Sequence, residues 1–479
     1  MKNKNNPENP VNKKIKTESI PNFDSQIFVR SQKAMNVYEI IKKKRDGFDL
    51  SGEEIKFLVS GFVKGRIPDY QMSAFLMAVY YRSMNIRECC DLTRAMAESG
   101  EIVDLSKIEG FNVDKHSTGG VGDTTTLVLA PLVAASGGIV AKMSGRELGH
   151  TGGTVDKLES IPEMQVELSK DRFLEIVNDI HVSVIAQTAN LAPADKQIYA
   201  LRHVTATIDS IPLIASSIMS KKLAAGADGI VLDVKTGAGA FMQKYEDAVE
   251  LAKIMVSIGE GEGKRVEALI TGMEQPLGNA IGNAVEVKEA IDTLNGNGPQ
   301  DLVDLVLELG SMMLVISGVE SSFSAAHRML ETHIDQKKGL KKLAELIQAQ
   351  GGNPDVIVNS DLLPQPKTKI EITSEVSGFI EKINALEVGM AARILGAGRK
   401  TKTAPIDLSI GILLKKKVGD RVKKGEPLAV FYSDGDKQKI DPAKAKFIGA
   451  YTIGERQVEP PGLFYAKVSA DKVEEYSAS

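Results

Sequence analysis

The sequence predicts an α/β fold in three parts: a helical lobe, a lobe built on a mainly parallel sheet, and a β-rich C-terminal α+β domain. Helical spacing without intervening strands predicts the first part over residues 35–100. Short apolar runs then alternate with helical stretches over residues 101–350, which is typical of parallel strands covered by helices on both faces. Strand-like runs joined by Gly-containing turns predict a sandwich-like domain over residues 355–479. A chain of 479 residues that is 43% hydrophobic is long enough for two or three such cores.

Charge and cysteine content narrow the functional class. The chain has 59 Lys and Arg against 63 Asp and Glu, so no overall positive field favours a nucleic-acid partner. No apolar run is long enough for a transmembrane helix, so no membrane partner is expected. The two cysteines, Cys89 and Cys90, are adjacent, which excludes a disulfide framework and predicts a reducing, cytoplasmic location. Residues 1–34 lack the apolar segment of a secretory signal and are expected to form a flexible N-terminal extension.

Capping patterns mark the beginnings of the first helices. Ser51 and Glu54 have the spacing of a capping box, and apolar residues follow at helical intervals. A second amphipathic helix is expected from about Tyr70 to Tyr81. Asn85 and Glu88 repeat the capping pattern and predict a third helix. These three helices make up the helical lobe.

Apolar runs and turn residues place the elements of the other two parts. The strands expected in the α/β lobe are Gly110–Val113, Ile139–Ala141, Val182–Ile185 and Ile230–Val234. Helices are expected from Thr124, near Thr154 and over Ile211–Ala224. In the C-terminal domain the expected strands are Ile370–Ile372, Leu408–Leu414 and Leu428–Tyr432.

The first segment that carries chemistry is Val113–Thr126, which leaves a predicted strand, passes through three glycines and enters a helix. Glycines let backbone N–H groups approach a ligand closely, and a helix N-terminus carries partial positive charge. Further donors would come from Lys115, Ser117, Thr124 and Thr126. These are the requirements of a phosphate cradle, although the segment lacks the Walker A pattern and, taken alone, also fits a structural turn.

A second glycine-rich segment, Lys142–Thr154, also follows a strand and precedes a helix. Loops that follow neighbouring parallel strands meet at the same carboxyl edge of the sheet, where open α/β folds bind their ligands. Two cationic, hydroxyl-rich loops at one edge indicate a dianion, and inorganic phosphate is the simplest candidate.

Polar residues on an otherwise apolar helix form the third feature. Ser217 and Lys221 are four residues apart in the predicted helix and therefore share a face, whereas Ile214, Ile218 and Leu223 are expected to point elsewhere. Together with Arg202 on the preceding helix, they could bind the carbonyl oxygens of a flat heterocycle. Taken alone, the pattern also fits a solvated Ser/Lys face.

Three long motifs together resemble one family. Lys115–Thr126, the run from Ser144 to Glu159, and Ser216-Ser217-Ile218-Met219-Ser220-Lys221-Lys222 look like the signature of the thymidine and pyrimidine-nucleoside phosphorylases. The motifs occur in the family's order, and the resemblance extends from about Met35 to Tyr432. The pattern is most similar to bacterial members that accept uridine, thymidine and deoxyuridine. The resemblance implies reversible phosphorolysis of pyrimidine nucleosides, which yields the free pyrimidine and (deoxy)ribose 1-phosphate.

The resemblance also implies an architecture and a set of site residues. A later helical excursion, about residues 194–224, would join the helical lobe, and the protein would be a homodimer formed through that lobe. Phosphate would be held by Lys115, Ser117, Thr126, Lys142, Met143, Ser144 and Thr154. The pyrimidine would be held by His116, Arg202, Ser217 and Lys221. No organic cofactor is implied, but a structural potassium ion is, at Gly122, Thr124, Leu277, Ala280 and Glu289.

The chemistry assigns roles to three of these residues. Breaking the glycosidic C–N bond builds positive charge on the sugar and negative charge on the departing base. Phosphate would stabilise and then capture the sugar cation, while Arg202 and Lys221 would draw electron density from the base carbonyls. His116 would donate a hydrogen bond to a base oxygen, as general acid or electrostatic stabiliser. These three residues are the expected catalytic groups. Of the other histidines, His150 is expected to be structural, and His181, His203, His327 and His333 to lie at the surface or in packing.

The chain departs from the family pattern at Glu147, which stands where a small residue is usual. A carboxylate beside the phosphate loop would weaken anion binding if it pointed inward, so it is expected to face solvent.

Three alternatives stay open at this point. A strict thymidine phosphorylase would share every motif and reject uridine. A phosphoribosyltransferase of related fold lacks support, because the pyrimidine-binding residues are present. The segment Val418–Leu428 resembles part of a biotinyl/lipoyl-type carrier sandwich, but such a carrier needs a lysine at a hairpin tip, and Lys444 is a poor match for it.

Overall fold

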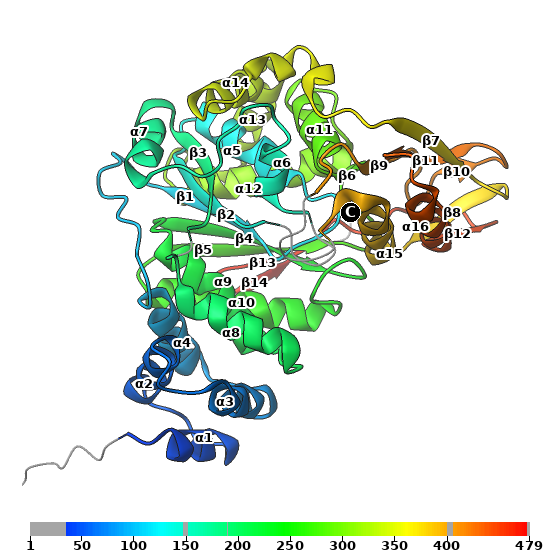
Figure 1. Ribbon diagram of the computed structural model, residues 1–479. Helices are drawn as coiled ribbons and strands as arrows, with labels where there is room; N and C mark the ends of the chain where they lie inside the picture. Colours follow the sequence, from blue (N-terminus) through cyan, green and yellow to red (C-terminus); the bar gives the residue numbers. More distant parts are fainter. Residues whose placement is uncertain (1–34, 147–151, 189, 400–405, 477–479) are drawn as a thin grey trace, which may run out of the picture.

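A computed structural model describes residues 35–146, 152–188, 190–399 and 406–476, and Figure 1 shows how its elements are arranged. The predicted N-terminal extension, residues 1–34, lies outside the described residues. Within them, the chain forms the expected helical lobe, α/β lobe and β-rich C-terminal part (Figure 1). No helix of the described residues is both long enough and apolar enough to cross a bilayer.

The helical lobe begins with one helix more than the sequence predicts. α1 (Val37–Arg45) precedes α2 (Gly52–Val63), α3 (Asp69–Arg82) and α4 (Ile86–Ala97). Both predicted capping boxes are confirmed: Ser51 and Glu54 cap α2, and Asn85 and Glu88 cap α4. The excursion that joins this lobe consists of α8 (Pro193–Val204) and α9 (Ile211–Ala224), and α9 packs along α4.

The sheet of the α/β lobe is parallel at its centre. β1 (Val113–Ser117), β4 (Gly229–Thr236) and β5 (Arg265–Gly272) pair in parallel in that order. β2 (Val140–Ser144) and β3 (Val182–Ala186) form a second parallel pair, which a bridge between Asn112 and Ile139 joins to the β1 side.

Two of these strands lie further along the chain than the sequence predicts. The expected strand over Gly110–Val113 is β1, which begins only at Val113 and runs to Ser117, and the expected Ile139–Ala141 is β2, which extends to Ser144. Hydrophobicity misplaces them because their second halves carry Lys, His and Ser. Backbone pairing with neighbouring strands satisfies the main chain, and buried carboxylates balance the charges of the two lysines, so the strands continue through these residues.

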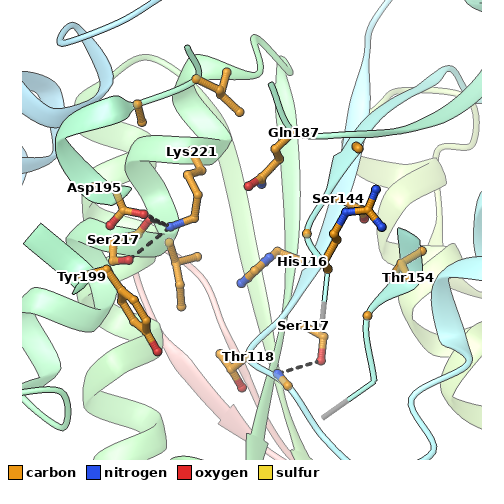
Figure 2. A pocket seen from close by; sticks show the side chains of 18 of the residues that line it. His116, Ser117, Thr118, Ser144, Thr154, Gln187, Asp195, Tyr199, Ser217 and Lys221 are labelled. Atoms are coloured by element: carbon orange, nitrogen blue, oxygen red, sulfur yellow. Dashed lines mark hydrogen bonds and ion pairs between the residues drawn. The ribbon is translucent and has the colours of Figure 1, made fainter. Parts of the chain in front are cut away.

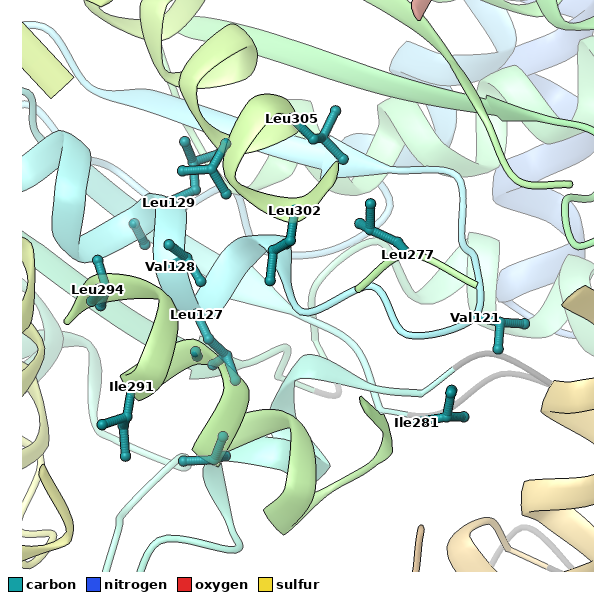
Figure 3. Packing of buried hydrophobic residues seen from close by; sticks show 14 of the residues in the cluster. Val121, Leu127, Val128, Leu129, Leu277, Ile281, Ile291, Leu294, Leu302 and Leu305 are labelled. Atoms are coloured by element: carbon teal, nitrogen blue, oxygen red, sulfur yellow. The ribbon is translucent and has the colours of Figure 1, made fainter. Parts of the chain in front are cut away.

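The sheet separates two hydrophobic cores, because successive side chains of a strand point to opposite faces. In β4, Val231 belongs to the core beneath α5 and α12, whereas Ile230 and Leu232 belong to the core shared with the helical lobe. Figure 3 shows the first core, in which Leu127 and Val128 of α5 lie near Leu302 of α12 and Ile291 of α11. The remaining helices of this lobe are α5 (Thr125–Ala135), α6 (Thr154–Leu158), α7 (Lys170–Ile180), α10 (Tyr245–Gly261), α11 (Ala284–Leu294), α12 (Gln300–Ile316), α13 (Phe323–Asp335) and α14 (Lys338–Ala349).

Two small sheets form the C-terminal part. One has the order β6-β9-β11-β7 and the other β10-β8-β12, so β6 of the α/β lobe (Ala280–Gly282) is shared with the C-terminal part. The elements are β7 (Thr368–Thr373), β8 (Gly378–Ile383), α15 (Ala385–Ala392), β9 (Gly411–Leu414), β10 (Arg421–Val422), β11 (Pro427–Ser433), α16 (Lys437–Gly449) and β12 (Tyr451–Gly454). The predicted strand Leu408–Leu414 therefore begins later, at Gly411.

The last two strands do not belong to the C-terminal sheets, although the sequence analysis placed all of residues 355–479 in that domain. β13 (Phe464–Val468) pairs antiparallel with β5, and β14 (Val473–Glu475) pairs with β13, so the chain returns to extend the central sheet. The exposed edge of β5 supplies the unpaired backbone groups that this strand satisfies. The return ties the C-terminal part to the α/β lobe at both of its ends.

Candidate active site

A cavity of ≈ 900 Å³ lies between the carboxyl edge of the sheet and the helices α8 and α9. Figure 2 shows labelled side chains on two sides of the cavity, with His116 between them. Asp195, Tyr199, Ser217 and Lys221 come from the helices, and Ser117, Ser144 and Thr154 come from the ends of β1 and β2 and the start of α6. The two predicted glycine-rich segments thus meet at one cavity and face the polar side of the predicted helix.

The sheet side of the cavity is rich in hydroxyls and backbone donors. β1 and the loop after it contribute Ser117, Thr118, Gly119, Gly120, Asp123 and Thr126. β2, the loop after it and the start of α6 contribute Lys142, Ser144, Gly145, Arg146, Gly152, Gly153 and Thr154. The predicted residues Ser117, Thr126, Lys142, Ser144 and Thr154 therefore lie at one cavity.

Two predicted phosphate residues do not line the cavity. Successive residues of a strand face opposite sides, so Lys115 points away from the side that His116 occupies. Its buried ammonium lies 3.3 Å from Asp233 and 3.7 Å from the cavity-lining Asp123, yet it makes no hydrogen bond. Met143 is buried in the core shared with the helical lobe. Lys115 thus lies one layer beneath the glycine loop, and Met143 contributes packing.

A buried ion-pair cluster surrounds His116. Asp114 accepts from Lys142 at 3.0 Å and from Lys222 at 2.7 Å. Burial alone would raise the pKa of Asp114, but the two ammoniums outweigh it and hold that pKa well below its ordinary value. Burial lowers the pKa of His116 well below its ordinary value, and the ammoniums of Lys222 and Lys142 lower it further. The imidazole is therefore neutral near pH 7 and offers one N–H donor to the cavity.

Lys142 is held in place by two acceptors while its amine reaches the cavity. It donates to Asp114 and to the backbone oxygen of Lys115, which leaves one of its three N–H groups for a ligand. Burial lowers the pKa of Lys142 to about 8, although the nearby Asp114 acts in the opposite direction. Lys142 is thus positively charged at neutral pH and loses that charge in mildly alkaline solution.

The helical side of the cavity presents a cation that is anchored by a carboxylate. Lys221 forms an ion pair with Asp195 of α8 and donates to the backbone oxygen of Ser217 and, at 3.1 Å, to its hydroxyl. Asp195 has a second oxygen that is buried without a hydrogen-bond partner. Ser217 and Lys221 therefore share the face that their four-residue spacing predicts.

Arg202 lines the cavity but is only 1% exposed. Its three nitrogens donate to the backbone oxygens of Thr207 (3.2 Å), Leu213 (3.0 Å) and Ile208 (2.6 Å). Burial lowers the pKa of Arg202 to about 10, so it remains charged near pH 7. The guanidinium thus anchors the turn between α8 and α9 while it presents charge to the cavity.

Several residues that line the cavity were not predicted from the sequence. Ile214 and Ile218, which were expected to point elsewhere, line the cavity together with Ser217 and Lys221. Positions 214, 217, 218 and 221 follow helical i, i+3, i+4 and i+7 spacing, so this signal was present and could have placed both isoleucines. Other lining residues that carried no recognised motif include Leu168, Gln187, Asp195, Tyr199, Ile208 and Phe241. The apolar residues of this lining suit the faces of a flat ring.

The five residues predicted to hold potassium lie close together behind the glycine loop. Gly122 has φ +73°, and a Cβ there would clash with the carbonyl oxygen of Leu277 and lie 3.0 Å from that of Ala280. One carboxylate oxygen of Glu289 accepts from Asn279 and Ala280, while the other is buried without a hydrogen-bond partner. The hydroxyl of Thr124 lies 3.4 Å from the carbonyl of Gly122. Backbone carbonyl oxygens and a buried carboxylate oxygen without a partner are the kinds of ligand that a monovalent cation takes.

Two residues named by the sequence analysis, Glu147 and His150, lie outside the described residues. The other four predicted packing or surface histidines do not line the cavity. His333 of α13, for example, contacts Ser136 at the end of α5 at 2.8 Å. The described residues contain no group of three or more His, Cys, Asp or Glu side chains that could hold a metal ion.

Family models match the three parts of the chain. "Glycosyl transferase family, helical bundle domain" matches residues 38–100, and "Glycosyl transferase family, a/b domain" matches residues 109–348. "Pyrimidine nucleoside phosphorylase C-terminal domain" matches residues 379–454.

Curated relatives match almost the whole chain. The chain is 54% identical to a pyrimidine-nucleoside phosphorylase of Geobacillus stearothermophilus over 435 residues, which are 91% of this chain and all of that protein. It is 56% identical to a protein of the same name from Bacillus subtilis, with the same coverage. Among solved structures, anthranilate phosphoribosyltransferase from Thermus thermophilus is similar with a TM-score of 0.53. At 19% identity over 65% of this chain and 99% of that one, this last likeness shows the fold alone.

Proposed function

This chain belongs to the pyrimidine-nucleoside phosphorylase family, and we propose that it catalyses the reversible phosphorolysis of uridine, thymidine and deoxyuridine in the cavity between its two lobes. The C1′–N1 bond of the nucleoside breaks and its electron pair leaves with the base, while an oxygen of hydrogen phosphate bonds to C1′. The base takes up a proton to become the free pyrimidine, which balances the proton that the phosphate loses on becoming the sugar phosphate dianion. The observation that carries the proposal is the two-sided cavity, with anion donors on the sheet edge and anchored cations on α8 and α9.

Phosphate binds on the sheet side in this proposal. The hydroxyls of Ser117, Thr126, Ser144 and Thr154 and the remaining N–H of Lys142 supply donors. The backbone of Gly119 and Gly120 can approach the anion closely, since neither carries a side chain. Lys115, whose buried ammonium makes no hydrogen bond, adds positive charge from beneath. Such a site favours a dianion and places it beneath the sugar.

The pyrimidine binds on the helical side. Ser217, whose hydroxyl oxygen accepts from Lys221 and keeps its O–H, donates to a carbonyl oxygen of the base. Lys221 and Arg202 add positive charge, and Ile214 and Ile218 pack on the ring. Charge that develops on the departing base is stabilised by cations that Asp195 and backbone carbonyls already hold in position, so little reorganisation is needed.

His116 lies between the two sides and stabilises the leaving base as a neutral donor. Its lowered pKa means that the ring carries one N–H near pH 7, which suits a hydrogen bond to a carbonyl oxygen that gains negative charge. Bringing the lobes together around the substrates would exclude water that could otherwise capture the sugar cation.

A potassium ion would be held by the carbonyls of Gly122, Leu277 and Ala280, the hydroxyl of Thr124 and the carboxylate of Glu289. The unpartnered oxygen of Glu289 and the close approach of Gly122 to Leu277 support this fit. The ion would supply fixed positive charge that orders the glycine loop. No organic cofactor enters the reaction.

The assembly is a homodimer formed through the helical lobe, and the location is the cytoplasm. The homodimer is supported by large side chains exposed on this lobe, among them Tyr38, Tyr70 and Tyr81. The cytoplasmic location is supported by the two cysteines, which form no disulfide.

One assay tests the activity. The chain is incubated with uridine and inorganic phosphate, and uracil release is followed against a reaction without phosphate. Uracil that forms only with phosphate is expected. Release of thymine from thymidine but no uracil from uridine would favour the strict thymidine phosphorylase, and no release from either nucleoside would contradict the proposal.

The carrier alternative is not favoured. Lys444, the lysine that would have to bear the lipoyl or biotinyl group, lies inside helix α16 and not at the tip of a hairpin. The curated relatives are named as phosphorylases over nearly the whole chain.

A further inference from the structure

The C-terminal part contacts the back of the glycine loop through one short segment. Residues 276–280 lie between the loop 119–122 and the turn that follows β9. On one side, the backbone N–H of Leu277 donates to Val121 at 3.0 Å, and Gly122 lies so close to Leu277 that no side chain fits. Displacement of residues 276–280 would therefore move the glycine loop.

Lys417 holds the same segment from the other side. Its ammonium donates to the backbone oxygens of Pro276 at 2.6 Å and Gly278 at 2.8 Å, and to Asp301 at 2.7 Å. These three acceptors use all three N–H groups of the lysine. The side chain is 19% exposed, so the bonds are partly shielded from water. Lys417 thus hydrogen-bonds to the backbone on both sides of Leu277.

Further hydrogen bonds hold the other residues of this backbone segment. The N–H of Val418 donates to Gln275 at 3.0 Å, and the N–H of Leu414 donates to the carbonyl of Asn279 at 2.8 Å. Asp301, at the start of α12, also accepts from the N–H of Gly278 at 3.2 Å. Every residue from 275 to 279 except Leu277 is therefore tied to the C-terminal part or to α12, and Leu277 is tied to the glycine loop.

We propose that Lys417 is a positioning residue for phosphate, through which the C-terminal part holds the glycine loop in its binding geometry. The contact runs from Lys417 to the backbone at Pro276 and Gly278, through Leu277 to Val121, and so to the donors at Gly119 and Gly120. This inference rests on the proposed function, since it assigns phosphate to that loop. It gives the C-terminal part a role in the reaction, although none of its described residues lines the cavity.

Lysine variants at two consecutive positions test the inference. Lys417→Met removes the ammonium and keeps the length of the side chain. Lys416→Met is the matched control, because Lys416 is 20% exposed and its ion pair with Glu426 lies within the C-terminal part. The Michaelis constants for phosphate and uridine are measured separately for both variants and the wild type, together with thermal unfolding.

The expected result is a rise of about tenfold in KM for phosphate in Lys417→Met, with KM for uridine unchanged, because a loop displaced by a fraction of an ångström misaligns its donors. Lys416→Met should behave as the wild type. If Lys417→Met does not fold, Lys417→Gln, which keeps two donors without the charge, is measured in its place and should show a smaller rise confined to phosphate.

Unchanged phosphate KM in a folded variant would overturn the inference, as would an equal rise for both substrates or the same rise in Lys416→Met. Wild-type chain that releases no uracil at all would instead refute the proposed function. The two failures are therefore distinguishable.

Discussion

Lys221 and Lys222 are consecutive residues of α9 whose ammonium groups have different surroundings. Lys221 faces the cavity beside Asp195, whereas Lys222 is buried and donates to Asp114 of β1 at 2.7 Å. Lys222 thus joins the helix that carries Ser217 and Lys221 to the strand that carries His116. Buried ion pairs cost desolvation, but removal of one partner leaves an uncompensated charge, so this contact constrains how the two lobes meet.

Replacement of Lys221 should separate catalysis from folding. Lys221→Ala removes the cation proposed to face the base, and kcat/KM for uridine should fall by about a hundredfold or more, as for loss of one preorganised electrostatic group. The fold should stay intact, but the melting temperature should fall, because Asp195 is only 8% exposed and loses its ion-pair partner. Lys253→Ala on the exposed side of α10 is the control. Normal phosphorolysis by Lys221→Ala would remove this residue from the base site.

The pKa of Lys142 predicts an alkaline loss of activity. Since that pKa is about 8, the ammonium is present below pH 8 and is lost as the pH rises through it. Phosphate is already a dianion in this range, so kcat/KM for phosphate should decline above about pH 8 through loss of the Lys142 charge. In Lys142→Met, activity should be lower at pH 7 and the decline near pH 8 should disappear. A wild-type profile that stays level to pH 9.5 would contradict the role.

At the scale of elements, the glycine loop depends on the turn behind it. Gly122 and Gly263 have nearly the same backbone angle, φ +73° and +72°, but a Cβ at Gly122 would clash with Leu277, whereas Gly263 has open space around it. Gly263→Ala should therefore cost about 1–2 kcal/mol of unfolding free energy from the left-handed conformation alone. Gly122→Ala should cost about 1–3 kcal/mol more from overpacking, and it should also weaken phosphate binding. Chemical denaturation and the phosphate KM of both variants measure this difference. Equal costs, with phosphate binding unchanged, would show that the loop does not depend on this close approach.

Periodicity and capping predict helices well, because they depend on neighbours in the chain. Ser51 with Glu54 and Asn85 with Glu88 identify two helix starts, and α9 has the predicted limits. Strand limits depend on partners distant in sequence, so β1 and β2 continue through Lys115 and Lys142, whose charges are balanced by Asp233 and Asp114. The residues next to Lys115 and Lys142 in the sequence do not indicate that these distant carboxylates pair with them.

The same limit applies to the site. The motifs brought Ser117, Ser144, Thr154 and Lys221 to one cavity, because loops after parallel strands share an edge. The predicted strand ended at Val113 and left Lys115 in the loop, whereas β1 continues to Ser117 and alternation places Lys115 on the face opposite His116. Asp195 was missed for a different reason, since its role is visible only once α8 packs beside α9 and brings it to Lys221.

At the scale of the whole molecule, the chain passes through the α/β lobe three times. It leaves for α8 and α9, returns, leaves again for the C-terminal sheets and finally returns as β13 along β5. The helical excursion carries the groups proposed to bind the base, and the C-terminal excursion carries Lys417. The cavity is thus assembled from segments that lie far apart in sequence, and only the central sheet relates them in space.

The helical lobe presents an apolar surface that predicts its role in assembly. Tyr38 of α1 is 61% exposed, and Tyr70 and Tyr81 of α3 are 73% and 76% exposed, on two helices that pack against each other. Large exposed aromatic side chains on neighbouring elements are typical of protein interfaces, where they supply most of the contact area.

Charge placed on this surface should therefore separate the subunits. The double variant Tyr70→Arg/Tyr81→Arg puts like charges opposite each other across a two-fold interface, and sedimentation equilibrium should show a dimer for the wild type and a monomer for the variant. Val358→Arg, at a position 88% exposed and outside the helical lobe, should remain a dimer. Since the cavity lies between α9 and the sheet of a single chain, the monomer should still bind phosphate. A variant that stays dimeric would place the interface elsewhere, and a monomeric wild type would refute the assembly itself.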